Sequence, residues 1–91
     1  MIKLTGRLVC TNREESEIVR HYLPEHKRLT HEEAGCISFD VTETADPLIW
    51  QVEECFTDKD AFDTHQKRTK VSVWGKETGA IAREYKIFDV E

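Results

Sequence analysis

Half of a small α+β unit can be read from residues 35–65, GCISFDVTETADPLIWQVEECFTDKDAFDTH. Residues 36–44 alternate apolar and polar side chains, and so do residues 48–56, a period of two that is typical of β-strands. Between them, Ala45-Asp46-Pro47 has the composition of a tight turn. Residues 48–56 carry apolar groups on both faces, so we expect this strand to be central in its sheet and covered on both sides.

A helix follows the second of these strands. Thr57 with Asp60 three residues on resembles a capping box, and Asp58 belongs to the same cap. We expect the helix to continue to Lys70 and to present His65 about two turns from its start. This histidine is therefore the first candidate for a reactive group.

The segments on either side complete an alternating plan. Residues 2–10 alternate and predict a first strand, and Thr11-Asn12 can cap the helix that follows. Apolar residues then recur at intervals of three and four until Gly35, which ends the helix. Pro24 interrupts this pattern, so we expect a kink or the start of a second helical segment there.

The C-terminal part supplies a short helix and a last strand. Residues 71–79 predict a further helical segment that bears Trp74, and residues 83–90 alternate again. The resulting βαββαβ order predicts a ferredoxin-like α+β fold, with one antiparallel sheet and both helices on one face. Because the other sheet face would be bare, we expect a second copy of the chain to cover it in a C2 dimer.

The composition describes a small and highly charged protein. Its 91 residues suffice for one domain, residues 1–91. Charged residues make up 34% and the net charge is −5, without a basic run interleaved with aromatics, which argues against nucleic acid as a partner. No apolar segment approaches the roughly 20 residues of a membrane helix. The alternating N-terminus lacks the apolar core of a signal peptide, so we expect a cytoplasmic protein.

Cysteine and histidine spacing do not indicate a metal site. The three cysteines form no pair with the spacing of zinc ligands, and we interpret them as small buried apolar residues. His21, His26 and His31 are five residues apart, so successive imidazoles point in different directions around a helix. We expect His26, which lies on the apolar stripe, to be the least solvated of the three.

Part of the chain carries a family pattern. It consists of residues 35–39, the Asp46-Pro47 turn, and the run E-x-F-x-D-x-x-A-F-x-x-H over residues 54–65. With this pattern the chain resembles the antibiotic biosynthesis monooxygenase (ABM) superfamily, the dimeric α+β barrels that include small quinol monooxygenases. The resemblance implies a homodimer that oxygenates small aromatic substrates with dioxygen, without metal, flavin or other cofactor.

The chain departs from the haem-degrading members of that superfamily. Those members use an Asn in the first strand, a Trp in the second helix and a His about ten residues further. Here the first strand has no Asn, the helix has His65, and Gly75 stands ten residues on. The departures argue against haem degradation.

Cofactor-free oxygenation needs a base, a dry cavity and a hydrogen-bond donor for charge on oxygen. His65 is the candidate base because imidazole titrates near neutral pH. Trp50 and Trp74 are candidate cavity walls, and Tyr85 and Arg7 are candidates for orienting a substrate oxygen. Each also has a structural interpretation: a hydrogen-bonded histidine on its helix stripe, core or interface tryptophans, and packing on a strand.

Glu54 and the reaction class stay open at this point. Glu54 lies on an apolar strand face, either as a buried ion-pair member with Arg7 or Arg83, or as a carboxylate in a cavity. Besides a quinol-type monooxygenase, the pattern is compatible with a non-enzymatic dimer that binds a small molecule. An isomerase that moves a proton through His65 without consuming oxygen is the third interpretation.

Overall fold

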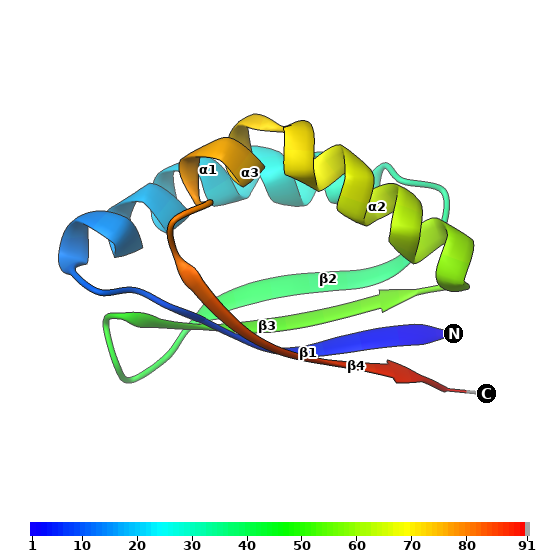
Figure 1. Ribbon diagram of the computed structural model, residues 1–91, viewed down its shortest axis with the longest axis horizontal. Helices are drawn as coiled ribbons and strands as arrows, with labels where there is room; N and C mark the ends of the chain where they lie inside the picture. Colours follow the sequence, from blue (N-terminus) through cyan, green and yellow to red (C-terminus); the bar gives the residue numbers. More distant parts are fainter. Residues whose placement is uncertain (91) are drawn as a thin grey trace.

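The computed structural model describes residues 1–90 of the chain, in the predicted βαββαβ order and with the expected short helix before the last strand (Figure 1). The elements are β1 (Ile2–Val9), α1 (Arg13–His31), β2 (Cys36–Glu43), β3 (Ile49–Phe56), α2 (Lys59–Val71), α3 (Val73–Glu77) and β4 (Ala82–Asp89). The helices form a layer over one face of the sheet (Figure 1). Within the described residues, no helix combines the length and apolarity needed to cross a membrane.

Side-chain caps determine where the helices begin. Asn12 accepts a hydrogen bond from the backbone N–H of Glu15 and starts α1. Asp58 does the same for α2 through the N–H of Ala61 at 2.8 Å. The cap of α2 is therefore Asp58, one residue after the expected Thr57, and its carboxylate accepts from the third amide of the helix.

α1 is a single helix with Pro24 inside it, where the sequence predicted a kink or a new segment. The missing N–H of Pro24 leaves the carbonyl of Arg20 without its helical partner. Both residues are exposed, so water can bond that carbonyl and the helix continues. α1 also ends at His31, with Glu32 as its C-cap, before the Gly35 that was expected to stop it.

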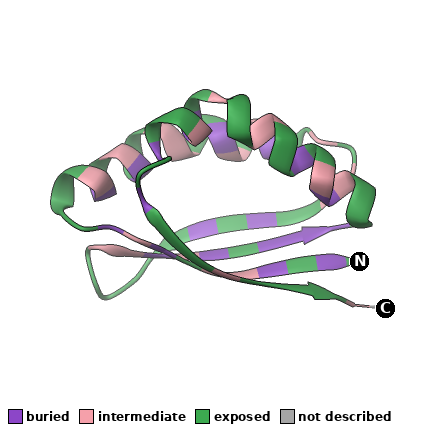
Figure 2. Cartoon of the chain, in the orientation of Figure 1, coloured by how far each residue is buried: buried purple, intermediate pink, exposed green. Residues whose placement is uncertain are grey.

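The sheet confirms the predicted ferredoxin-like topology. Its strand order is β2-β3-β1-β4, every neighbouring pair is antiparallel, and β3 is an inner strand as expected. Along β1 and β3 the even-numbered residues face the helices and form the core, which includes Leu4, Leu8, Val52 and Phe56. Figure 2 shows this alternation on the inner strands and a largely exposed β4.

The outer sheet face is more polar than the sequence pattern suggested. Thr5 donates a hydrogen bond to Glu53, and Arg7 pairs with Glu84, both at 2.6 Å. Apolar side chains on this face include Cys55, which is buried, and Phe88, which is 46% exposed. Among the described residues 1–90, no helix lies over this outer face of the sheet (Figure 1). A homodimer that closes over it stays a prediction.

Gly6 of β1 allows β4 to approach closely. A Cβ atom at Gly6 would lie 2.1 Å from the carbonyl oxygen of Glu84 and 2.7 Å from the ring of Tyr85. We expect Gly6→Ala to lower the free energy of unfolding by about 1–3 kcal/mol, because the backbone of β4 must move. Urea unfolding would measure it. Thr5→Ala, which removes one exposed hydrogen bond, should cost less than about 1 kcal/mol; equal losses would contradict the close approach.

Candidate active site

A small cavity lies between the helix layer and the sheet. Its volume is about 40 Å³, and its lining comes from all three helices and from β2, β3 and β4. The lining residues are His26, Phe39, Val41, Val52, Glu54, His65, Gln66, Thr69, Trp74, Arg83 and Tyr85. Such a volume accommodates a water or dioxygen molecule, and is far below the roughly 300 Å³ of the smallest usual ligand pockets.

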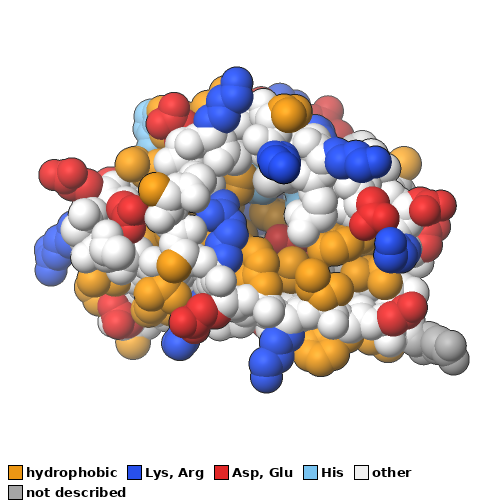
Figure 3. Space-filling view, viewed as in Figure 1, with side chains coloured by type: hydrophobic (Ala, Val, Ile, Leu, Met, Phe, Trp, Pro, Cys, Tyr) orange, Lys and Arg blue, Asp and Glu red, His pale blue; other side chains and the backbone are white. Residues whose placement is uncertain are grey.

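The side of the molecule along which β4 runs leaves this region partly uncovered. Figure 3 shows a hollow there between the helix layer and the sheet, with hydrophobic atoms exposed next to it. Ile87 pairs with Leu4 and faces the helix side of the sheet, yet it is 55% exposed. The helix layer therefore does not cover the end of β4.

His65 is one of the residues that line this cavity, and it is only 2% exposed. Its Nδ1 is 3.1 Å from both carboxylate oxygens of Glu33, which also accepts a hydrogen bond from the guanidinium of Arg68. Its Nε2 is 3.4 Å from Oε1 of Glu54, close enough for charge attraction although that oxygen makes no hydrogen bond. The imidazole is thus held between two carboxylates, one of which orients it.

The two carboxylates control the charge of this imidazole. Burial alone would lower the pKa of His65, but the adjacent Glu54 and Glu33 carboxylates stabilise the imidazolium and raise this pKa above its ordinary value. A histidine in this state exchanges a proton near neutral pH. It can act as a general base when neutral and as a general acid once protonated.

His26 is a second buried imidazole in the same lining. It stacks on Trp74 with parallel rings 4.6 Å apart, and its ring centre is 6.0 Å from that of His65. Burial, with repulsion from His65 and the cations Arg68 and Arg83, lowers the pKa of His26 to about 3. His26 is therefore neutral near pH 7, and only His65 of this pair is suited to proton transfer.

The cavity contains unused hydrogen-bonding capacity. Within residues 1–90, two buried side-chain atoms lack a hydrogen-bond partner, Nδ1 of His26 and Oε1 of Glu54. Both residues line this one cavity. Because buried polar atoms are almost always satisfied, their coincidence in one place indicates a site for a small polar group.

The structure brings three of the five predicted site residues together. His65, Trp74 and Tyr85 all line the cavity. Burial, assisted by the charge of Glu54 and opposed by Arg83, raises the pKa of Tyr85 to about 12. Its hydroxyl consequently stays protonated at neutral pH and is available as a hydrogen-bond donor.

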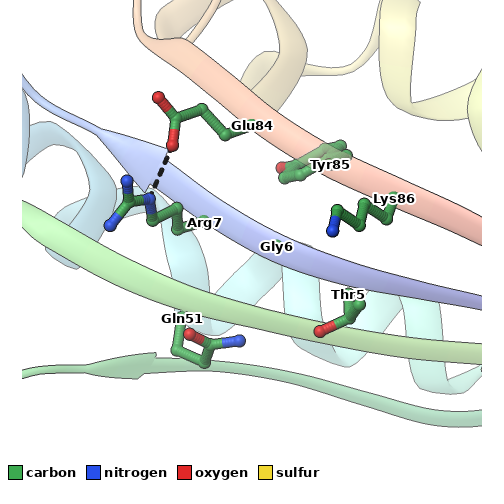
Figure 4. A pocket seen from close by; sticks show the side chains of 7 residues that line it. All are labelled: Thr5, Gly6, Arg7, Gln51, Glu84, Tyr85 and Lys86. Carbon is green, nitrogen blue, oxygen red and sulfur yellow. Dashed lines mark hydrogen bonds and ion pairs between the residues drawn. The ribbon is translucent and has the colours of Figure 1, made fainter.

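Arg7 and Trp50 lie elsewhere. Arg7 is on the outer sheet face, where Figure 4 shows it pointing toward Glu84 in a shallow depression next to Gln51. Trp50 is buried on the inner face, but its Nε1 donates to Ser16 Oγ at 3.0 Å and the guanidinium of Arg20 covers its ring. Neither residue is among those that line the His65 cavity.

Glu54 belongs to the cavity, where its nearest cationic group is His65. The arginines expected as its partners are otherwise engaged: Arg7 pairs with Glu84, and Arg83 donates to the carbonyls of Thr78 and Ile81. The sequence did not point to Glu33, because the turn after α1 carries no pattern that places its side chain against α2. For His26 the apolar stripe of α1 was the available signal.

With its four-stranded antiparallel sheet and helices on one face, the protein has a ferredoxin-like α+β fold. An acid–base cluster between the two layers forms its internal candidate site. The family model for antibiotic biosynthesis monooxygenase matches residues 1–77. The chain therefore belongs to the antibiotic biosynthesis monooxygenase family. Comparison with curated protein sequences finds no match.

Solved structures show the same fold at low sequence identity. A candidate antibiotic biosynthesis monooxygenase of Nitrosomonas europaea is 16% identical, with a TM-score of 0.85 over 99% of this chain and 98% of its own. A second candidate monooxygenase, from Deinococcus radiodurans, is 18% identical with a TM-score of 0.79, covering 100% and 93%. SnoaB, a cofactor-independent oxygenase from Streptomyces nogalater, is 14% identical with a TM-score of 0.78, covering 99% and 92%.

Proposed function

We propose that this protein is a cofactor-independent monooxygenase that acts with dioxygen on a small quinol-like or polyphenolic compound. The observation that supports it most directly is the small cavity, in which His65 lies next to Glu54. Two buried atoms of its lining residues, Nδ1 of His26 and Oε1 of Glu54, have no hydrogen-bond partner. Family membership and the fold shared with a neighbour described as a cofactor-independent oxygenase support the same reaction class.

The reaction balances without an added reductant. A hydroquinone and dioxygen give a hydroxyquinone and water: one oxygen atom forms a new C–O bond, and the other leaves as water. All the electrons come from the substrate, which must first lose a proton because the phenolate gives an electron to dioxygen more readily than the phenol. A base in a cavity shielded from water is therefore the essential protein contribution.

His65 fits the role of that base. The carboxylate of Glu33 at Nδ1 keeps the proton on that nitrogen. The lone pair of Nε2, which lies 3.4 Å from Thr69 Oγ1, is then the acceptor for the phenolic proton. The carboxylates of Glu54 and Glu33 stabilise the imidazolium that forms. The protonated hydroxyl of Tyr85 can then donate to negative charge that develops on oxygen.

The dimensions of the cavity restrict which part of a substrate it can receive. About 40 Å³ suits a hydroxyl group or dioxygen and excludes an aromatic ring. In the proposed reaction the hydroxyl-bearing edge of the substrate therefore reaches the cavity while the ring stays outside it.

Oxygen uptake by metal-stripped protein tests the proposal. We expect saturable consumption of dioxygen above autoxidation with some members of a hydroquinone and polyphenol panel, unchanged by chelator, with ¹⁸O from ¹⁸O₂ recovered in the product. Boiled protein is the control for trace metals. Uptake no faster than autoxidation across the panel would contradict an oxygenase. Proton exchange into a carbonyl compound without oxygen uptake would favour the isomerase interpretation.

A further inference from the structure

A second and larger cavity adjoins the first. It is a groove of about 380 Å³ between α1 and the start of α3, two elements that pack against each other. Apolar and aromatic side chains provide most of its surface, among them Tyr22, Leu29, Val73 and Trp74. Its volume lies within the range of roughly 300–1,000 Å³ that is usual for small-molecule pockets.

The groove and the His65 cavity share a wall. His26 and Trp74, whose rings are stacked, line both spaces. Both side chains are largely buried, with 4% and 6% of their surface exposed, so they form the aromatic floor of the groove. A planar ring can pack against them in one of the geometries that aromatic pairs favour.

We propose that the groove between α1 and α3 binds the planar ring of a small aromatic alcohol against the stacked His26 and Trp74. A ring seated there lies against the two side chains that separate the groove from the cavity that contains His65. Identifying this ring as that of the substrate rests on the proposed function, whereas the binding site itself does not.

The other depression next to the cavity is chemically less suitable. It has about 340 Å³ and is lined by polar and basic side chains and two glycines: Gln66, Thr69, Lys70, Gly75, Gly79 and Arg83. It also shares lining residues with the cavity. Because it offers no aromatic or aliphatic side chain for a ring to pack on, we assign the ring to the groove.

Tryptophan fluorescence under anaerobic conditions tests the site without any turnover. The variant Trp50→Phe leaves Trp74 as the single tryptophan, and 1,4-dihydroxynaphthalene is the probe. We expect saturable quenching that Val73→Phe, which fills the groove, weakens at least tenfold. Val71→Phe is the matched control at a neighbouring exposed valine outside the groove and should change affinity less than twofold. Lys70→Phe obstructs the polar depression at a residue outside the His65 cavity and should likewise have little effect.

The outcomes separate the site from the reaction. Binding that survives Val73→Phe but is lost in Lys70→Phe, or no saturable binding at all, overturns the groove assignment. If the probe binds as expected but no oxygen is consumed, the assignment of the groove as a binding site is supported and the proposed oxygenase activity is refuted. Equilibrium dialysis of the probe against Val73→Phe and Val71→Phe on the wild-type background repeats the comparison should Trp50→Phe fold poorly. trans-1,4-Cyclohexanediol, which has the hydroxyls without the flat ring, should not compete.

Discussion

Replacing His65 by glutamine is expected to reduce the kcat/KM of oxygen uptake by about 10²- to 10⁴-fold, the usual contribution of a positioned general base. Glutamine keeps the approximate size of the side chain and a donor for Glu33, but it cannot accept a proton near neutral pH. The other imidazole that lines the cavity is no equivalent base, since burial lowers the pKa of His26 to about 3. Measured rates would be corrected for autoxidation.

Two further variants make this result specific. His21→Gln changes an exposed histidine of α1 and should leave kcat/KM within about twofold of wild type. Glu54→Gln removes a charge that raises the pKa of His65, so the rise of activity with pH should move to lower pH. Near-wild-type uptake by a folded His65→Gln variant would refute the assignment of His65 as the base and direct attention to Tyr85.

Replacing His26 by phenylalanine is expected to make the free energy of unfolding less dependent on pH on the acid side, because it removes the contribution of this imidazole. In the unfolded chain this imidazole binds a proton below its ordinary pKa of 6.5, whereas in the folded protein it does so only near pH 3. The unfolded state therefore binds more protons between these values, and stability falls as pH decreases through this window. The loss between pH 7 and pH 4 amounts to about 3 kcal/mol, a large share of the roughly 5–15 kcal/mol of a typical domain.

The groups that face His26 determine the background of this measurement. His65, Arg68 and Arg83 all disfavour a charge on His26. The pKa of His65 is shifted the other way, so its contribution to stability is complete below 6.5 and is lost as pH rises through its folded value. This contribution and those of the carboxylates are present in both proteins and largely cancel on comparison.

Urea unfolding at pH 7 and pH 4 would measure the effect. We expect the stability difference between the two pH values to be about 3 kcal/mol smaller in His26→Phe than in wild type. His21→Phe, at an exposed position of the same helix, should behave as wild type. An identical pH dependence in wild type and His26→Phe would show that His26 is not kept neutral by burial.

The order of the elements was predictable because its causes are local. Alternation in residues 36–44 and 48–56, the apolar stripe of α1 and the polar caps are properties of neighbouring residues, and they determine backbone conformation over a few residues. Errors occurred where two local signals competed or where exposure decided the outcome. Asp58 replaced Thr57 as the cap, and no second helical segment begins at the exposed Pro24.

The contacts of the candidate site, in contrast, join residues that are far apart in the sequence. His65 could be recognised in advance, because a histidine on the apolar stripe of a helix must face the sheet. Its carboxylate neighbours could not, since Glu33 and Glu54 are 32 and 11 residues away in sequence and reach it only after α1, β3 and α2 have packed.

Local sequence thus specified the fold class, the position of His65 and the strand that carries Glu54. Only the tertiary structure showed that His26 and Trp74 stack and that Arg7 and Trp50 lie away from His65. The physical reason is that secondary structure depends on interactions within a few residues. The polarity, size and charge of a cavity depend on which side chains meet from distant segments, and on which of their hydrogen-bonding atoms remain unpaired.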